Sequence, residues 1–481
     1  ICILRRSRCS ATASCPIIDQ SALAEVSLSQ QLSRSLRPRH VAMISIGGII
    51  GAGLFVGSSA AISATGPAAL LSYLLAGVLI LLVMRMLGEM AVALPTTSAF
   101  TEFARAALGP WAGFICGWLY WYFWIIVVPV EAIAGANIMH QWLPLPTWQL
   151  GLGLMAVMTA VNLMSARSYG EFEFWFASIK VAAIIAFIVL TAAYVFGWTS
   201  PQGVTLGNLT RYGGFMPSGP VSVLASAVTV LFSLTGAEIA TVAAAESTEP
   251  ARAVAKLTTS VIVRILIFYV LSISLIVTAV PWTAVHAGES PFTLTLSTMH
   301  FGWASTAMSA VILTAVLSCL NSAFYVCSRV MFLLAAHGDA PQWLVQVNAR
   351  HVPTRSVCIG AIAGVIGILS ATLAPQTVFA FLVNASGALI VFIYILISLA
   401  QIQLRQQRER RGEPQPALLM WLFPWASYAA IAGFIAVVVA MAVTPGQQRD
   451  LYFSLITLAV VLLAYAALRR RRVGRAATVL S

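Results

Sequence analysis

Three ionisable residues, Glu131, Lys180 and Glu238, lie inside long apolar stretches of this sequence. A charge at the centre of a membrane costs about 2.5 to 3.5 kcal/mol on insertion scales, so residues of this kind are functional candidates. A desolvated lysine or carboxylate can exchange a proton near neutral pH, which is the chemistry that proton coupling needs. For Lys180 the alternative is a permanent structural cation bonded to carbonyls of the first apolar stretch. For Glu238 a gating role and a bond to loose backbone are the two interpretations.

A glycine-rich stretch, Ile46-Gly47-Gly48-Ile49-Ile50-Gly51-Ala52-Gly53-Leu54-Phe55, lies in the first apolar segment. Each glycine destabilises a helix by about 1 kcal/mol relative to alanine, and lipid cannot satisfy the backbone groups of an opened helix. A weaker version recurs at Phe232-Ser233-Leu234-Thr235-Gly236-Ala237-Glu238. A pair of interrupted segments in corresponding halves indicates a transporter's binding site. We therefore predict two helix breaks that bind a ligand, with closed helices using glycine for close packing as the alternative.

Composition places the chain among polytopic membrane proteins. Hydrophobic residues make up 60% of the chain and charged residues 9%, and the mean hydropathy is +0.91. The net charge of +12 is distributed over short loops and the chain ends, so it predicts topology and no nucleic-acid binding. The 7 cysteines form no CxxC motif, and we predict no metal and no cofactor. Signatures of metallohydrolases, serine hydrolases and Walker-type ATPases do not occur in the sequence, so nothing in it supports an enzyme or an ATP-driven pump.

Twelve apolar segments must position these residues, and they predict an all-α protein with 12 transmembrane helices. The segments lie at residues 41–62, 68–93, 111–140, 148–165, 172–197, 221–245, 258–280, 304–335, 356–373, 376–401, 418–443 and 451–468. Basic residues fall in alternate loops, which predicts two cytoplasmic termini: a disordered tail at 1–35 and a basic tail at 469–481. In the second segment Arg85 and Glu89 are four residues apart and predict a structural ion pair.

The sequence resembles the amino acid permease family of the amino acid/polyamine/organocation (APC) superfamily, and within it most closely the bacterial GABA (4-aminobutyrate) permeases. The resemblance covers nearly the whole chain from about Arg39 to Arg411. It is carried by RHVAM at 39–43, GIIGAGLF at 48–55, GWLYW at 117–121, PVEA at 129–132, YGEFEFW at 169–175, AAAES at 243–247 and SCLNSA at 318–323. The resemblance implies a five-plus-five inverted repeat over 36–403, with helices 1 and 6 broken, and two extra helices over 404–468.

The resemblance also implies a substrate site. Its residues are Ile49, Gly51, Ala52, Gly53, Phe232, Thr235 and Gly236. The amides of Ala52 and Gly53 would hold the substrate's carboxylate, and the carbonyls of Ile49 and Thr235 would accept hydrogen bonds from its amine. A zwitterion needs donors at one end and acceptors at the other, and a broken helix supplies both from its backbone.

Other residues receive gating and coupling roles from the same resemblance. Phe232 would close over the substrate, Lys180 would act as a proton switch, and Glu238 and Glu131 would take part in proton coupling or gating. The predicted function is a secondary active transporter in the inner membrane that imports a small amino acid, GABA or a close analogue, together with protons. The alternatives are a proton-independent exchanger, a permease for another amino acid such as proline or alanine, and, least favoured, a membrane sensor. The predicted partners are the amino acid, protons and the lipid bilayer, and no oligomeric state is predicted.

Overall fold

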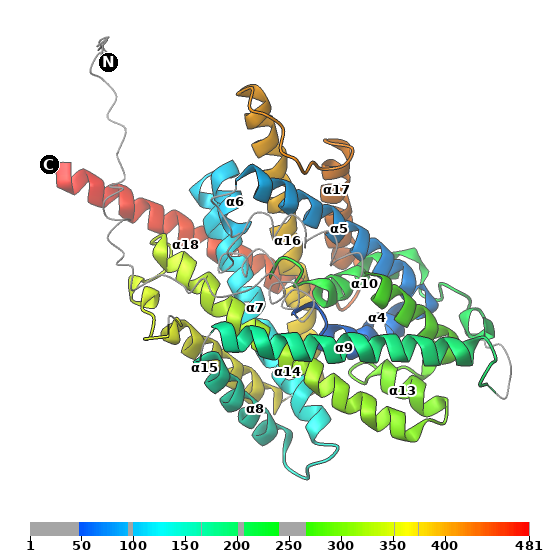
Figure 1. The fold of residues 1–481 in the computed structure, drawn as a ribbon. Helices are drawn as coiled ribbons and strands as arrows, with labels where there is room; N and C mark the ends of the chain where they lie inside the picture. The colour runs from blue at the N-terminus through cyan, green and yellow to red at the C-terminus, as the bar shows by residue number, and fades with distance from the viewer. Residues whose placement is uncertain are drawn as a thin grey trace, which may run out of the picture.

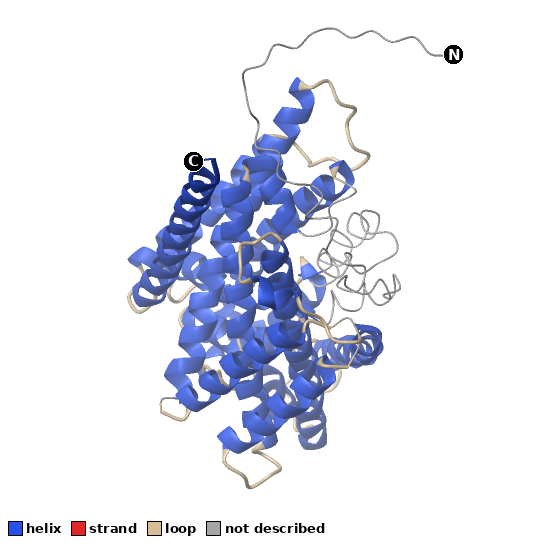
Figure 2. Cartoon of the chain, turned by 90° about the vertical axis from the view of Figure 1, so that its left-hand side faces the viewer, coloured by secondary structure: helices blue, strands red, loops and turns tan. Residues whose placement is uncertain are grey.

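The computed structural model describes residues 48–94, 100–164, 166–200, 206–239, 266–350, 352–373 and 375–480. The predicted tail at 1–35 and the motifs at 39–43 and 243–247 lie outside the described residues. Within the described ranges the regular structure is helical throughout, as predicted for an all-α protein (Figures 1 and 2). The α-helices are α3 (Ala52–Phe55), α4 (Ser58–Thr65), α5 (Ala69–Ala93), α6 (Phe100–Leu108), α7 (Pro110–Met139), α8 (Thr147–Asn162), α9 (Ala166–Val195), α10 (Gly219–Leu234), α13 (Pro291–Thr298), α14 (Gly302–Ala336), α15 (Thr354–Ala371), α16 (Pro375–Arg410), α17 (Trp425–Val443) and α18 (Gln448–Leu480), with a further apolar helix at Leu266–Ala279.

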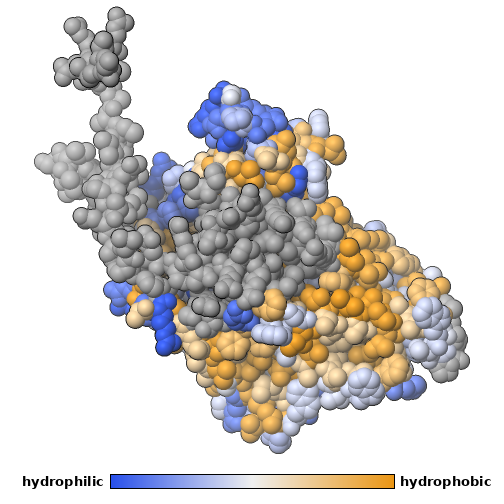
Figure 3. Space-filling view, viewed as in Figure 1, coloured by the Kyte–Doolittle hydropathy of each residue, from blue (hydrophilic) through white to orange (hydrophobic). Residues whose placement is uncertain are grey.

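Eight helical stretches of the described chain are long and apolar enough to cross a membrane. They are Ala52–Ala93, Pro110–Met139, Glu171–Val195, Gly302–Ala336, Thr354–Ala371, Phe381–Arg410, Trp425–Val443 and Gln448–Arg470. Figure 3 shows a broad hydrophobic surface on one side of the molecule, with hydrophilic residues gathered at the end of α16. The chain is therefore a multi-pass membrane protein.

The count of twelve spans stays a prediction, because four of the expected segments are short among the described residues. The first expected segment is represented by α3 and α4 at the start of the Ala52–Ala93 stretch. The fourth and sixth correspond to α8 and α10, each with 16 residues, and the seventh to the helix Leu266–Ala279.

Helix α7 packs against helices from several parts of the chain. It contacts α6, α8, α14, α15 and α16, and most of its side chains are buried, including Glu131. Small residues allow this close packing: a Cβ atom at Gly367 of α15 would lie 2.3 Å from the Pro129 ring of α7. Glu131 is therefore carried by a long helix that is held in place on several sides.

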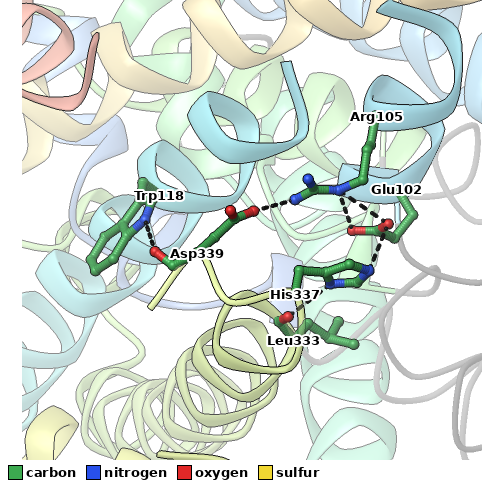
Figure 4. A network of polar contacts seen from close by, with 6 residues as sticks. All are labelled: Glu102, Arg105, Trp118, Leu333, His337 and Asp339. Atoms are coloured by element: carbon green, nitrogen blue, oxygen red, sulfur yellow. Dashed lines mark hydrogen bonds and ion pairs between the residues drawn. The ribbon is translucent and has the colours of Figure 1, made fainter. Parts of the chain in front are cut away.

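A polar network ties α6 to the segment that follows α14 (Figure 4). Arg105 of α6 forms ion pairs with Asp339 and, at 3.3 Å, with Glu102. The Trp118 indole donates a hydrogen bond to the backbone oxygen of Asp339 at 3.2 Å, and His337 Nε2 lies 3.2 Å from Glu102. The contact with Glu102 raises the pKa of His337 above its ordinary value of 6.5. This network links α6 and α7 to the segment after α14.

Arg85 and Glu89 attract each other electrostatically, as predicted, but the hydrogen bonds of each side chain go to another segment. Arg85 Nε donates to the carbonyl of Leu419 at 2.7 Å. Glu89 accepts the amide of Met420 at 2.6 Å and the side-chain amide of Gln401 at 3.0 Å. The connection between α16 and α17 covers this face of α5 and supplies partners that helical spacing cannot reveal.

Candidate substrate site between two helix breaks

The first apolar segment is interrupted at Ile50 and Gly51, as predicted. Residues 48 and 49 are helical, residues 50 and 51 form a bend, and α3 begins at Ala52. Gly51 has an extended backbone, with φ −137° and ψ −151°, so any residue could adopt its conformation. A glycine is needed here for lack of space, since a Cβ at position 51 would lie 2.7 Å from Cys319 and from an oxygen of Glu131.

The second break follows α10, which ends at Leu234. Thr235 is extended, and Gly236 has a φ of +126°, a conformation that favours glycine. The freed amide of Gly236 donates to both carboxylate oxygens of Glu238 at 3.1 Å, and Tyr394 donates its hydroxyl proton to Glu238 at 3.2 Å. Glu238 therefore bonds the loose backbone at the break, which was one of its two predicted interpretations.

The two breaks lie against each other. A Cβ on Gly53 would lie 2.6 Å from the backbone of Ser233, and one on Gly236 would lie 2.8 Å from the carbonyl oxygen of Gly48. The hydroxyl of Tyr269 lies 3.0 Å from the carbonyl of Ile49 and 2.9 Å from that of Ser233. Its single proton can be donated to either oxygen, so Tyr269 links the carbonyls of the two interrupted segments.

Glu131 of α7 binds the first break. The backbone amide of Ala52 donates to both oxygens of the Glu131 carboxylate, each at 3.1 Å. The side chain is 1% exposed, so the contact is shielded from water. A carboxylate thus occupies the amide that the family resemblance assigns to the carboxylate of a substrate.

Lys180 of α9 also binds the first break. Its ammonium group donates to the carbonyl of Ile50 at 2.8 Å, which the interruption has freed from helical bonding. The side chain is fully buried. A lysine bonded to a carbonyl of the first apolar segment has the geometry predicted for a structural cation, which is the alternative to a proton switch.

Two cavities lie along the interrupted segments and α7. The smaller, of about 10 Å³, is lined by Ile49, Gly53, Glu131, Phe232, Thr235 and other residues. The larger, of about 1170 Å³, is called the vestibule below and is lined by residues at the end of α7 such as Asn137 and Ile138, the segment before α13, Thr229 and Asn384. Phe232, one turn after Thr229 on α10, lines the small cavity, and its ring is tilted against that of Phe123 with the centroids 6.0 Å apart. Its role as a gate stays a prediction.

The structure adds residues that the sequence did not single out for the site. Phe123, Trp124 and Cys319 line the small cavity, and Tyr269 bridges the breaks. Glu173 is fully buried on the same helix as Lys180. The sequence does carry a signal for Glu173, since it is a carboxylate within the expected span 172–197. Among the described residues no group of histidine, cysteine and acidic side chains is arranged to hold a metal.

Comparison with known proteins identifies the family and the fold. The family model "Amino acid permease" matches residues 40–474. The gamma-aminobutyric acid permease of Bacillus subtilis (strain 168) is 42% identical over 93% of this chain and 96% of its own length. The probable GABA permease of Pseudomonas aeruginosa is 44% identical over 92% of this chain and 94% of its own.

A crystal structure of the Eremococcus coleocola manganese transporter shares the fold. It has a TM-score of 0.56 and 10% identity, and the match covers 92% of this chain and 97% of that one. At this identity the likeness concerns the fold alone. The sequence match, by contrast, extends through both interrupted segments and over almost the whole chain. This chain belongs to the amino acid permease family, whose members are transporters and not enzymes.

Proposed function

We propose that the protein is a proton-coupled symporter that imports GABA or a close analogue across the plasma membrane. The observation that carries the proposal is the carboxylate of Glu131 on the amide of Ala52. It supports a backbone site able to hold a carboxylate between two helix breaks. The GABA permeases among the relatives support the choice of substrate.

The substrate's carboxylate binds the amides of Ala52 and Gly53 once Glu131 has moved away. A cavity of about 10 Å³ is the space of a single water molecule, for which about 10 to 15 Å³ is needed. GABA is much larger, so binding requires side chains to be displaced. Because Glu131 occupies the donor that the substrate needs, its movement provides both the hydrogen-bond donor and part of the space.

The amine of the substrate binds the carbonyls of Ile49 and Thr235, at the other side of the breaks. Phe232 closes the site toward the vestibule, and Gly51 and Gly236 allow the backbone to approach its neighbours. Glu238 holds the second break in the geometry that binding requires. Lys180 and Glu131 connect proton binding to the state of the first break.

The proposal includes the predicted architecture. Spans 1 to 5 and 6 to 10 form an inverted repeat over 36–403, spans 11 and 12 follow over 404–468, and both termini are cytoplasmic. The arginine-rich end of α16 supports this orientation through the positive-inside rule. The vestibule at the opposite end of α7 then opens to the outside, the side from which the substrate enters.

Uptake of labelled GABA into proteoliposomes, driven by an imposed pH gradient, tests the function. We expect accumulation that an ionophore collapsing the gradient abolishes. A panel of unlabelled amino acids, including proline and alanine, identifies the preferred substrate by competition. Absence of flux with every amino acid of the panel contradicts the proposal.

Exchange without protons is a second candidate, and the bond of Lys180 to Ile50 favours it because it fits a fixed cation. An exchanger takes up labelled GABA only when the vesicles contain unlabelled amino acid. It also keeps this activity when no pH gradient is imposed. Comparison of empty and preloaded vesicles therefore separates the two candidates.

A further inference from the structure

Three ionisable side chains form a buried cluster beside the first break: Glu131 of α7 and Glu173 and Lys180 of α9. Their exposed fractions are 1%, 0% and 0%. Glu173 and Lys180 are roughly two turns apart on α9, so they share a face of the helix. The charge of Lys180 interacts with both carboxylates. We refer to these three residues as the acid–lysine cluster.

Helix α14 holds one half of the Glu173 carboxylate. The hydroxyl of Ser318 donates a hydrogen bond to Oε1, and the side chain of Asn321 also interacts with Glu173. Asn321 in turn accepts a hydrogen bond from Asn162 of α8 at 2.7 Å. In the part of the chain that the structure describes, Oε2 of Glu173 has no hydrogen-bond partner.

The charges of the cluster do not balance. One lysine and two carboxylates, all ionised, give a net charge of −1 (+1 −1 −1) in a region shielded from water. An uncompensated buried charge is strongly disfavoured, and groups in this position neutralise by binding or losing a proton. One additional proton brings the net charge of the cluster to zero, so the cluster should bind one proton.

The hydrogen bonds distinguish the two carboxylates. Both oxygens of Glu131 accept from the Ala52 amide, an arrangement that suits the ionised form. Lys180 donates to Ile50 at 2.8 Å, which suits the charged ammonium. Glu173 alone has an oxygen with no donor assigned to it among the described residues. The proton therefore fits best on Oε2 of Glu173.

We infer that Glu173 is the residue that carries the coupled proton, with Lys180 as its fixed countercharge. This inference rests on the proton-coupled transport proposed above. A proton from water on one side of the membrane forms an O–H bond at Oε2 and later leaves to water on the other side. One proton moves and no electrons are transferred. Lys180 keeps its own proton throughout the cycle.

The test uses the full chain in proteoliposomes with the membrane potential held at zero. A gradient of one pH unit corresponds to about 1.36 kcal/mol per proton, so the wild type is expected to accumulate GABA about tenfold. We expect Glu173→Gln to reach no accumulation, because its side chain is permanently neutral. It should retain exchange of labelled for unlabelled GABA at equal pH. Glu171→Gln, on the same helix and only partly buried, is the matched control and should behave as the wild type.

Each outcome has a definite meaning. If Glu173→Gln accumulates GABA as the wild type does, the inference is overturned while the proposed function stands. If the wild type itself does not respond to the gradient, the proposed function fails instead. If Glu173→Gln has lost exchange as well, its fold or its site is damaged and a second variant decides.

Ser318→Ala is that second variant, because it removes the donor to Oε1 and leaves the carboxylate in place. A lost hydrogen bond to the ionised form favours the protonated form. Uptake should therefore persist to a higher external pH than in the wild type, with exchange unchanged. A pH profile of uptake identical to that of the wild type overturns the inference, since a purely structural role for Glu173 would not move it.

Discussion

The carboxylate of Glu131 is bonded to the backbone amide of Ala52, 79 positions earlier in the chain, with both oxygens 3.1 Å from the nitrogen. An amide at a helix break attracts negative charge because no carbonyl of its own helix accepts from it. A substrate carboxylate that uses the same amide must displace Glu131. Binding of substrate and the position of Glu131 are then linked, and substitutions at the two sides of this contact should change transport in different ways.

Glu131→Gln should strengthen the binding of GABA. A hydrogen bond to a charged group contributes about 1.5 to 3 kcal/mol against about 0.5 to 1.5 kcal/mol for a neutral one, so the glutamine leaves Ala52 more easily. We expect the KM to fall about fivefold, equivalent to about 1 kcal/mol. Exchange measured over a range of GABA concentrations gives this value independently of proton coupling. A KM that rises would mean that Glu131 binds the amine of the substrate.

Gly53→Ala should abolish transport without preventing membrane insertion. The added Cβ would lie 2.6 Å from the backbone of Ser233, and overpacking of this kind costs about 1 to 3 kcal/mol. The two breaks would have to separate, which distorts the amides at the site. Gly153→Ala on α8 is the control, since a Cβ there meets nothing within 4 Å. Normal GABA flux through Gly53→Ala would contradict the close contact of the two breaks.

Tyr269→Phe removes the hydroxyl that links the carbonyls of Ile49 and Ser233. A buried acceptor that loses its donor costs about 1 to 3 kcal/mol. We expect a lower thermal unfolding temperature of the detergent-solubilised protein and a reduced rate of GABA exchange. Tyr452→Phe, at an exposed position on α18, should change neither. Unchanged stability and exchange in Tyr269→Phe would show that the hydroxyl is not needed to hold the breaks together.

The contact between His337 and Glu102 should make stability depend on pH. The hydrogen bond to Glu102 raises the pKa of His337 in the folded protein, so the folded state binds the proton more tightly than the unfolded chain. The stabilisation is fully present below the ordinary pKa of 6.5 and is lost as the pH rises through the raised value. Because the two side chains are 35% and 19% exposed, we expect a contribution of about 0.2 to 1 kcal/mol.

Thermal unfolding at pH 6 and pH 8 measures this contribution. His337→Gln should remove the contribution of this contact to the pH dependence of stability. The double variant with Glu102→Gln should show no further loss of that contribution. Arg105, which also contacts Glu102, is kept unchanged in all variants. Equal pH dependence in the wild type and in His337→Gln would exclude the contact as its source.

The two breaks could be predicted from the sequence because their causes are local. Four glycines within residues 47–53 weaken a helix wherever that helix lies. The run Thr235-Gly236-Ala237 acts in the same way, and the structure confirms that both segments open. The role of Glu238 at the second break could also be predicted, since Glu238 bonds an amide only two residues away.

The partners of the other charged groups could not be predicted from local spacing. Arg85 and Glu89 have the spacing of an ion pair on one helix, but the connection between α16 and α17 supplies each with a hydrogen-bond partner. Lys180 meets Ile50 across 130 positions, and Glu173 meets Ser318 across 145. Such pairings depend on how helices pack, which no periodicity in either segment encodes.

The sequence by itself determined that this is a helical membrane protein of the permease type with two weak points in its helices, because hydropathy, glycine content and motif spacing act along the chain. Only the tertiary structure decided that the two weak points face each other, that Glu131 lies on the first of them, and that Glu173 joins Lys180 nearby. The physical reason is that a buried donor must find an acceptor within hydrogen-bond distance, and which acceptor lies there is fixed by the packing of distant helices.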